Sequence, residues 1–388
     1  MYQLSFSLSE FLTQYWQKKP TIIKKGFQNF QDPMSPDELA GLTMEEEVDS
    51  RFVANLNDQW IAEHGPFNED KFAQLGETNW SFIVQAANHW HQGAAQLVKP
   101  FQTMPQWLFD DLMISYSVPD GGVGPHIDQY DVFIIQGSGK RHWRVGDKDI
   151  GQYKEVSRHA ALRQIESFEP IIDDILEPGD ILYIPPGFPH DGYALEPSMS
   201  YSIGFRSPKE QELISNFADY VLANDMGDVH MHNPDLATQN EYGVINKEAR
   251  EQLVHMLLAS LQDKTTINDF LGSTLSQSRH QLDIVVPAEP WEAEEVQQHL
   301  INGGDIHKVA GLRALYHDNE PGVAYINGEM VKVGNEEQTL LTVLCNKDSF
   351  TAQDIINSQA QDEPLAISAS SIALICEQIN KGYWFIED

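Results

Sequence analysis

A histidine and an aspartate two positions apart, His126 and Asp128, follow a turn that holds three glycines and a proline between residues 121 and 125. In a β-strand the side chains at positions i and i+2 point to the same face, so an imidazole nitrogen and a carboxylate oxygen can meet at one ion. A chain with 14 histidines and 58 acidic residues should contain about two such pairs by chance. The pair therefore predicts a metal site only if a third ligand accompanies it.

A second strand bounded by turns supplies a candidate for that ligand. Residues 177–180 (EPGD) indicate a turn, residues 181–184 an apolar strand, and residues 185–187 (PPG) end it. His190 follows this stop. A surface position is the alternative reading of His190. Together with His126 and Asp128, however, His190 would complete a ligand set of two imidazoles and one carboxylate. That set leaves one face of an octahedral metal open, as a non-haem Fe(II) oxygenase requires.

The segments around these residues resemble one enzyme group. GPHID (124–128) and PGDILYIPPGFPH (178–190) are similar to the JmjC branch of the cupin-fold 2-oxoglutarate oxygenases, and residues 11–26 resemble the lead-in to their barrel. DLMISYSVP (111–119) and GYWFIED (382–388) resemble the bacterial YcfD-type ribosomal oxygenases. The second resemblance extends over almost the whole chain.

The resemblance implies an α+β protein built on a double-stranded β-helix, the cupin or JmjC jelly roll, preceded by N-terminal helices. It implies Fe(II) as metal, 2-oxoglutarate and dioxygen as co-substrates, and hydroxylation of an arginine of large-subunit ribosomal protein L-sixteen. Histidine hydroxylation and lysyl demethylation within the JmjC group, or a non-catalytic cupin-fold binding protein, are the alternatives.

Periodicity selects a cation for the distal carboxylate of 2-oxoglutarate. Residues 132–145 predict a hairpin around a Gly-Ser-Gly turn. On its second strand Arg141 shares a face with Trp143 and Val145, so we expect Arg141 to point into the barrel and bind the carboxylate through two hydrogen bonds. An arginine that extends from the strand end into solvent is the alternative. The resemblance points to the same arginine, and to Ser115 as a second contact.

Substrate contacts are expected just beyond the metal pair. Gln129, Tyr130 and Asp131 follow Asp128 directly. An acid beside an aromatic ring suits a guanidinium, which can form a charge-assisted hydrogen bond and stack on the ring. Packing within the hairpin is the alternative role for Tyr130 and Asp131.

The composition constrains partners and location. The formal charge is −33, from 25 basic and 58 acidic residues, which argues against direct nucleic-acid binding and favours a basic partner such as a ribosomal protein. An acidic surface suited to a salty habitat is an equal alternative. No apolar run is long enough to span a membrane and the first residues do not resemble a signal peptide, so we expect a cytoplasmic protein.

Three segments are expected along the chain. Residues 1–206 form the JmjC/cupin domain. Residues 207–284 carry helical stripes of apolar side chains, usually intramolecular core, which by resemblance form a homodimerisation segment. Residues 285–388 are by resemblance a winged-helix-like domain, with a helix near residues 292–300, a hairpin near 323–333 and a last helix near 368–379. Five basic against seventeen acidic residues argue against phosphate binding by this domain.

Overall fold

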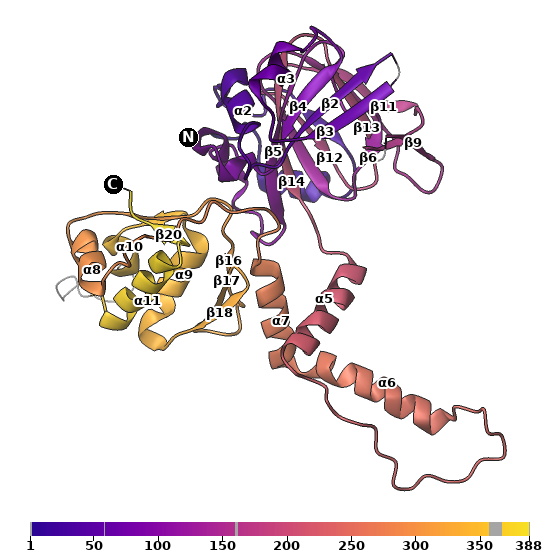
Figure 1. Cartoon of the computed structure of the whole chain (residues 1–388), viewed down its shortest axis with the longest axis vertical. Coiled ribbons are helices and arrows are strands. Elements are labelled where there is room, and N and C mark those ends of the chain that lie inside the picture. Colours follow the sequence, from indigo (N-terminus) through magenta and orange to yellow (C-terminus); the bar gives the residue numbers. More distant parts are fainter. Residues whose placement is uncertain (1, 58, 160–161, 357–366, 388) are drawn as a thin grey trace. The chain divides into compact units, whose positions relative to one another are not determined.

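Two antiparallel sheets make up most of the N-terminal half of the chain (Figure 1). The computed structural model describes residues 2–57, 59–159, 162–356 and 367–387, and its helices and strands lie within these ranges. The strands of the larger sheet are β1 (Thr21–Ile23), β2 (Ser50–Leu56), β3 (Gln59–His64), β4 (Trp80–Val84), β5 (Phe109–Ser117), β7 (Asp131–Gln136), β12 (Ile181–Ile184) and β14 (Ser198–Phe205). The strands of the smaller sheet are β6 (His126–Ile127), β8 (Arg141–Gly146), β9 (Glu155–His159), β10 (Leu162–Ile165), β11 (Pro170–Leu176) and β13 (Pro189–Ala194).

The strand order places distant segments side by side. The larger sheet runs β1-β12-β7-β14-β5-β4-β2-β3, and the smaller runs β11-β8-β13-β6-β10-β9. Neighbouring strands are therefore seldom consecutive in the chain, which is the crossing pattern of a jelly roll. The predicted double-stranded β-helix is confirmed.

Burial on both faces explains the continuous apolar runs of β7 and β12. Phe133 and Tyr183 belong to the core between the larger sheet and the N-terminal helices, whereas Ile134 and Leu182 belong to a second core. That second core also contains Val145 of β8, so it lies between the two sheets. Strands buried on both faces cannot show polar alternation.

Helices precede and cover the larger sheet. Ser7 caps α1 (Leu8–Gln14), whose Phe11 is buried against Tyr183, with the ring centroids 4.8 Å apart. Ser35 and Glu38 form a capping box at the start of α2 (Pro36–Leu42). The remaining short helices of this region are α3 (Glu69–Ala73), η1 (Ala87–His89), α4 (Gln92–Ala95) and η2 (Lys99–Phe101).

The predicted hairpin over residues 132–145 is wrong, although both of its strands exist. β7 pairs with β12 and β14, whereas β8 pairs with β11 and β13. The turn between them, with Gly139 at φ +72°, carries the chain from one sheet to the other. A Gly-Ser-Gly turn permits either connection, and burial of the apolar face of β8 against β7 and β12 favours the crossing.

The remainder of the chain is largely a second unit. The first unit comprises Met1–Ser207, Arg279–Val286 and Val309–Gly311, and the second comprises Pro208–Ser278, Pro287–Lys308 and Leu312–Asp388. The helices of the second unit are α5 (Glu210–Ala223), α6 (Lys247–Gln262), α7 (Lys264–Ser276), α8 (Ala293–Ile301), η3 (Asn335–Glu337), α9 (Gln338–Asn346), α10 (Ala352–Ile356) and α11 (Ala369–Asn380). Its strands are β15 (Ile306–Lys308), β16 (Ala314–Leu315), β17 (Val323–Ile326), β18 (Glu329–Lys332), β19 (Ser349–Phe350) and β20 (Trp384–Phe385).

The elements expected near the C-terminus are present. α8 and α11 match the two predicted helices to within one residue at each end, and β17 and β18 form the predicted hairpin, with Asn327 and Gly328 at its turn. Among the described residues, no helix combines the length and apolarity needed to cross a membrane.

Candidate metal centre

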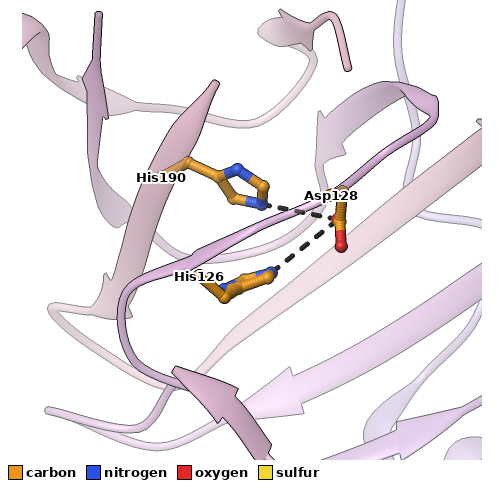
Figure 2. A group of neighbouring side chains, drawn as sticks. All are labelled: His126, Asp128 and His190. Atoms are coloured by element: carbon orange, nitrogen blue, oxygen red, sulfur yellow. Dashed lines mark ion pairs between the residues drawn. The ribbon is translucent and has the colours of Figure 1, made fainter. Parts of the chain in front are cut away.

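The structure brings His126, Asp128 and His190 together inside the jelly roll (Figure 2). His126 begins β6 and lies opposite His190 of β13 in the antiparallel register. Asp128 follows β6, and its Oδ2 lies 3.8 Å from Nε2 of His126 and 3.6 Å from Nε2 of His190. One potential ligand atom from each residue lies within 4.8 Å of the other two. The three side chains predicted to form the metal site therefore point toward one another.

Backbone carbonyls orient both imidazoles. Nδ1 of His126 lies 2.8 Å from the Gly124 carbonyl oxygen, and Nδ1 of His190 lies 3.1 Å from that of Phe188. A ring that donates its Nδ1 hydrogen to a carbonyl keeps a lone pair on Nε2. Burial, aided by the neighbouring His126, lowers the pKa of His190 to about 4, so its ring is neutral at physiological pH.

These three groups form an electron-rich cluster that fits a cation. The Nε2 and Oδ2 atoms face one another at 3.6 and 3.8 Å, too far apart for hydrogen bonds. Two imidazoles and one carboxylate could hold Fe(II) by one face and leave its other positions open. The donor set therefore fits the metal that the sequence predicts.

The cluster opens into a pocket between the sheets. Its lining combines apolar side chains with several hydroxyl groups. In addition to the three cluster residues, the side chains that line it include Gln85, Asp111, Met113, Ser115, Ser117, Tyr130, Arg141, Trp143, Ser200 and Ser202. A small molecule in this pocket could contact the metal cluster and Arg141 together.

Arg141 is a buried cation in this pocket. Its face was predicted correctly, since Arg141, Trp143 and Val145 of β8 are buried and the residues between them are more exposed. Nη1 donates to Ser115 Oγ at 3.1 Å and Nη2 to the Gly192 carbonyl at 3.1 Å, while Nε has no hydrogen-bond partner among the described residues. Burial lowers its pKa to about 10, against the opposing influence of Asp191.

This environment suits a carboxylate ligand. Within the described part of the chain, no carboxylate forms an ion pair with Arg141, and a buried guanidinium without a counter-ion is costly. A bound carboxylate would supply the counter-ion and accept from the guanidinium in two parallel hydrogen bonds. Ser115 and Ser200 both place a hydroxyl within 3.5 Å of Nη1, so the two serines extend the same polar end of the pocket.

The three residues after the metal pair occupy different environments. Gln129 is exposed. Tyr130 lines the pocket, where burial and the nearby charge of Asp128 raise its pKa. Asp131 is buried outside the pocket lining and accepts hydrogen bonds from Tyr183 Oη at 2.5 Å and Gln17 Nε2 at 3.0 Å. Of this predicted set, the structure brings Tyr130 to the pocket and directs Asp131 toward the N-terminal helices.

Asp111 is a pocket residue that sequence reasoning did not identify. Its carboxylate accepts from Gln85 Nε2 at 2.7 Å and from the Ala86 backbone N–H at 2.9 Å, and burial raises its pKa. It lies on β5, on which Met113, Ser115 and Ser117 also line the pocket. Alternate residues of a strand share a face, and Asp111 lies four positions before the predicted contact Ser115. This spacing could have identified Asp111 from the sequence.

Comparison with known proteins gives concordant matches over the whole chain. Residues 96–213 match the JmjC domain, and residues 259–385 match the ROXA-like winged helix. The chain is 46% identical over 386 residues to the ribosomal protein uL16 3-hydroxylase of Escherichia coli K12, covering 100% of this chain and 99% of that protein. A probable ribosomal oxygenase of Haemophilus influenzae is 30% identical over 393 residues, covering 97% and 95%.

A solved structure agrees with this relationship. The structure of YcfD, a ribosomal oxygenase from E. coli in complex with cobalt and 2-oxoglutarate, superposes with a TM-score of 0.90 at 45% identity, covering 100% of both chains. The resemblance seen in the sequence motifs is thus confirmed. The chain belongs to the JmjC-domain ribosomal oxygenases, the family of the E. coli uL16 3-hydroxylase.

Proposed function

We propose that this chain is an Fe(II)- and 2-oxoglutarate-dependent dioxygenase that hydroxylates an arginine side chain of large-subunit ribosomal protein uL16. The observation that carries the proposal is one pocket with the His126, Asp128 and His190 cluster beside a buried Arg141 that has no ion pair among the described residues. In this proposal the cluster holds the metal and Arg141 holds the distal carboxylate of the co-substrate. Family membership and the E. coli uL16 3-hydroxylase support the reaction and the protein substrate.

Fe(II), 2-oxoglutarate and dioxygen together supply oxidative decarboxylation and C–H hydroxylation. The residues of the chain would orient the metal ligands and the co-substrate. Gly124 and Phe188 fix the rings of the two histidines, and Tyr130 lies close enough to Asp128 for that carboxylate to raise the pKa of its hydroxyl. Ser115 lies within hydrogen-bond distance of Arg141 and can donate its hydroxyl hydrogen to the carboxylate that Arg141 binds.

The substrate arginine enters beside Asp111 in this proposal. Asp111 and Tyr130 both line the pocket near the metal cluster. A buried carboxylate whose pKa is raised by burial is stabilised by an incoming guanidinium, and an aromatic ring can stack on that group. Gln129 is exposed beside Tyr130 and could contact the substrate backbone. Asp111 thus takes the place that sequence reasoning gave to Asp131.

The charge of the chain supports a basic protein partner. The formal charge of −33 favours association with a basic ribosomal protein and opposes contact with phosphate backbones. The winged-helix region, at net −12 over residues 285–388, shares this character. We place the enzyme in the cytoplasm, where a bacterial ribosomal protein is made and assembled.

A homodimer is part of the proposal. No residue of α5 or α6 is buried, and their exposed apolar side chains include Ile214, Leu222, Val254, Leu257 and Leu261. Apolar surface on this scale is typical of a protein interface. Light scattering that gives the mass of one chain would contradict this part alone.

The decisive experiment is mass spectrometry of a uL16 peptide incubated with the purified chain. We expect the gain of one oxygen atom on an arginine, dependent on Fe(II), 2-oxoglutarate and dioxygen. A matched peptide with lysine in place of that arginine should remain unmodified. Decarboxylation of 2-oxoglutarate with oxygen placed on a histidine, or with loss of a lysine methyl group, would retain the enzyme class and reject the substrate residue.

A further inference from the structure

Trp143 is a second pocket residue whose donor has no acceptor in the described part of the chain. It lies two positions after Arg141 on the same face of β8, lines the pocket and is only 7% exposed. Its indole Nε1 is buried and has no hydrogen-bond partner among the described residues, as is true of Arg141 Nε. Two neighbouring pocket side chains thus each bury a donor that lacks an acceptor within the ranges that the structure describes.

The strand register places Trp143 between the metal cluster and Arg141. Along β13, His190 lies opposite Val145, Gly192 opposite Trp143 and Ala194 opposite Arg141. The Trp143 ring centroid lies 6.3 Å from that of His190, and the Arg141 guanidinium carbon lies 5.3 Å from the Trp143 ring. A molecule that extends from the cluster to Arg141 must therefore pass beside the indole.

Gly192 leaves the space in which this indole lies. A Cβ atom at Gly192 would lie 2.6 Å from Cε3 and 2.7 Å from Cδ2 of Trp143. Any side chain there would displace the ring, because such a separation is well inside van der Waals contact. The Gly192 carbonyl also accepts a hydrogen bond from Arg141. One glycine thus accommodates Trp143 and helps to orient Arg141.

We infer that Trp143 is a co-substrate-binding residue whose indole N–H donates a hydrogen bond to a carboxylate oxygen of 2-oxoglutarate. The inference rests on the proposed function, since it takes the co-substrate to span the metal cluster and Arg141. Such a bond pairs the buried indole donor with an ionised acceptor, and hydrogen bonds to charged groups are the stronger kind.

A buried indole without a partner is not by itself evidence for a ligand. Trp384 of the second unit is 1% exposed, and its Nε1 also has no hydrogen-bond partner in the described residues. Trp384 does not line the pocket that contains the metal cluster, whereas Trp143 does. Trp384 is therefore the matched control for the loss of an indole N–H.

The test is anaerobic calorimetric titration of 2-oxoglutarate into the full chain loaded with Mn(II). Replacing Trp143 with phenylalanine keeps an aromatic ring and removes the N–H, and it should weaken 2-oxoglutarate binding about tenfold. The W384F control should bind as the wild type does. Both variants should retain Mn(II) affinity. Equal 2-oxoglutarate affinity in W143F and wild type would overturn the inference.

A second measurement needs no variant to fold. The wild-type chain contains eight tryptophans, and labelling their indole nitrogens with ¹⁵N gives one N–H resonance for each. In the Zn(II)-loaded protein, 2-oxoglutarate should shift one indole resonance downfield, as a new hydrogen bond to a carboxylate does. Binding without such a shift rejects the role of Trp143, whereas no binding of 2-oxoglutarate to the metal-loaded wild type rejects the proposed function itself.

Discussion

His126 and His190 lie directly opposite each other in the antiparallel pairing of β6 and β13, with ring centroids 4.2 Å apart. The register of two short strands therefore sets the separation of the two imidazoles. A slip of one residue would turn one ring to the other face of the sheet. Residues more than sixty positions apart in the chain thus meet at one point because of strand pairing.

Replacing Asp128 with alanine should strongly weaken metal binding and abolish turnover. The two histidines would remain, but the carboxylate that faces both Nε2 atoms would be lost. We expect Mn(II) affinity, measured by electron paramagnetic resonance, to fall about 100-fold or more.

His142 provides the control for this prediction. It lies on the opposite face of β8 and contacts Tyr193 and Asp173 instead of the pocket. The H142A variant should retain Mn(II) affinity within about twofold. Retained metal binding in D128A, with the circular dichroism spectrum unchanged, would reject the assignment of this ligand.

Replacing Arg141 with alanine should impair 2-oxoglutarate binding while metal binding persists. Removing one partner of a buried charge pair costs about 2 kcal/mol or more, so the Kd of 2-oxoglutarate should rise about 30-fold or more. Arg144 is the matched control, because it lies on the other face of β8 and donates to the Phe168 carbonyl. Calorimetric titration of the Mn(II)-loaded variants distinguishes them, and a similar loss in R144A would show that the effect is not specific to the pocket.

Local patterns predicted the elements that carry these residues. The strand predicted from Ile181 to Ile184 has those bounds, because turn residues border an apolar run on both sides. The inward face of β8 followed from its period of two, which the burial of Arg141 and Trp143 confirms. Which residues of one strand share a face depends only on their spacing along that strand, so this feature can be predicted from the sequence.

Pairing between distant strands could not be predicted in this way. Consecutive strands joined by a short turn usually pair, yet β7 and β8 belong to different sheets. Asp131 opens β7, and its side chain is bonded to Tyr183 and Gln17, partners that no local pattern reveals. Asp111 reaches the pocket because its strand, β5, pairs with β14 within the larger sheet. These features depend on tertiary contacts.

Asp111 and Asp131 should differ in their effects when each is replaced with asparagine. The D111N variant loses the charge offered to the guanidinium, so the KM for the uL16 peptide should rise about tenfold while the Kd of 2-oxoglutarate stays unchanged. Because burial raises the pKa of Asp111, the wild-type KM should also rise as the pH falls through that raised value. Steady-state kinetics across pH measure both effects.

The D131N variant should retain the KM of the wild type. Burial raises the pKa of Asp131 in the folded chain, so its ionised form costs stability at pH values above that pKa. A neutral amide oxygen can still accept from Tyr183, and the melting temperature of D131N at pH 7 should therefore equal or exceed that of the wild type. A raised KM in D131N with an unchanged KM in D111N would reverse the assignment of the substrate acid.

Asp110 should make the stability of the first unit depend on pH in the acidic range. Burial opposes its ionisation, but the nearby His280, whose Nε2 lies 3.7 Å from Oδ1, and a hydrogen bond from Arg279 outweigh burial and lower its pKa to about 2. Asp110, Asp111 and His280 could in principle hold a metal. However, Arg279 Nη1 lies 3.0 Å from Asp110 Oδ1 and already places a cation there.

A depressed folded-state pKa contributes stability above the unfolded value, near 4, and this contribution is lost as the pH falls toward 2. At pH 5 the D110N variant should have a free energy of unfolding about 2 kcal/mol below that of the wild type, and the difference should shrink as the pH approaches 2. Urea unfolding followed by tryptophan fluorescence measures it. The E155Q variant is the control, because Glu155 is ion-paired to Arg163 at the exposed surface and such pairs contribute little. A D110N deficit that persists unchanged at pH 2 would mean that Asp110 stabilises the unit through packing and not through its charge.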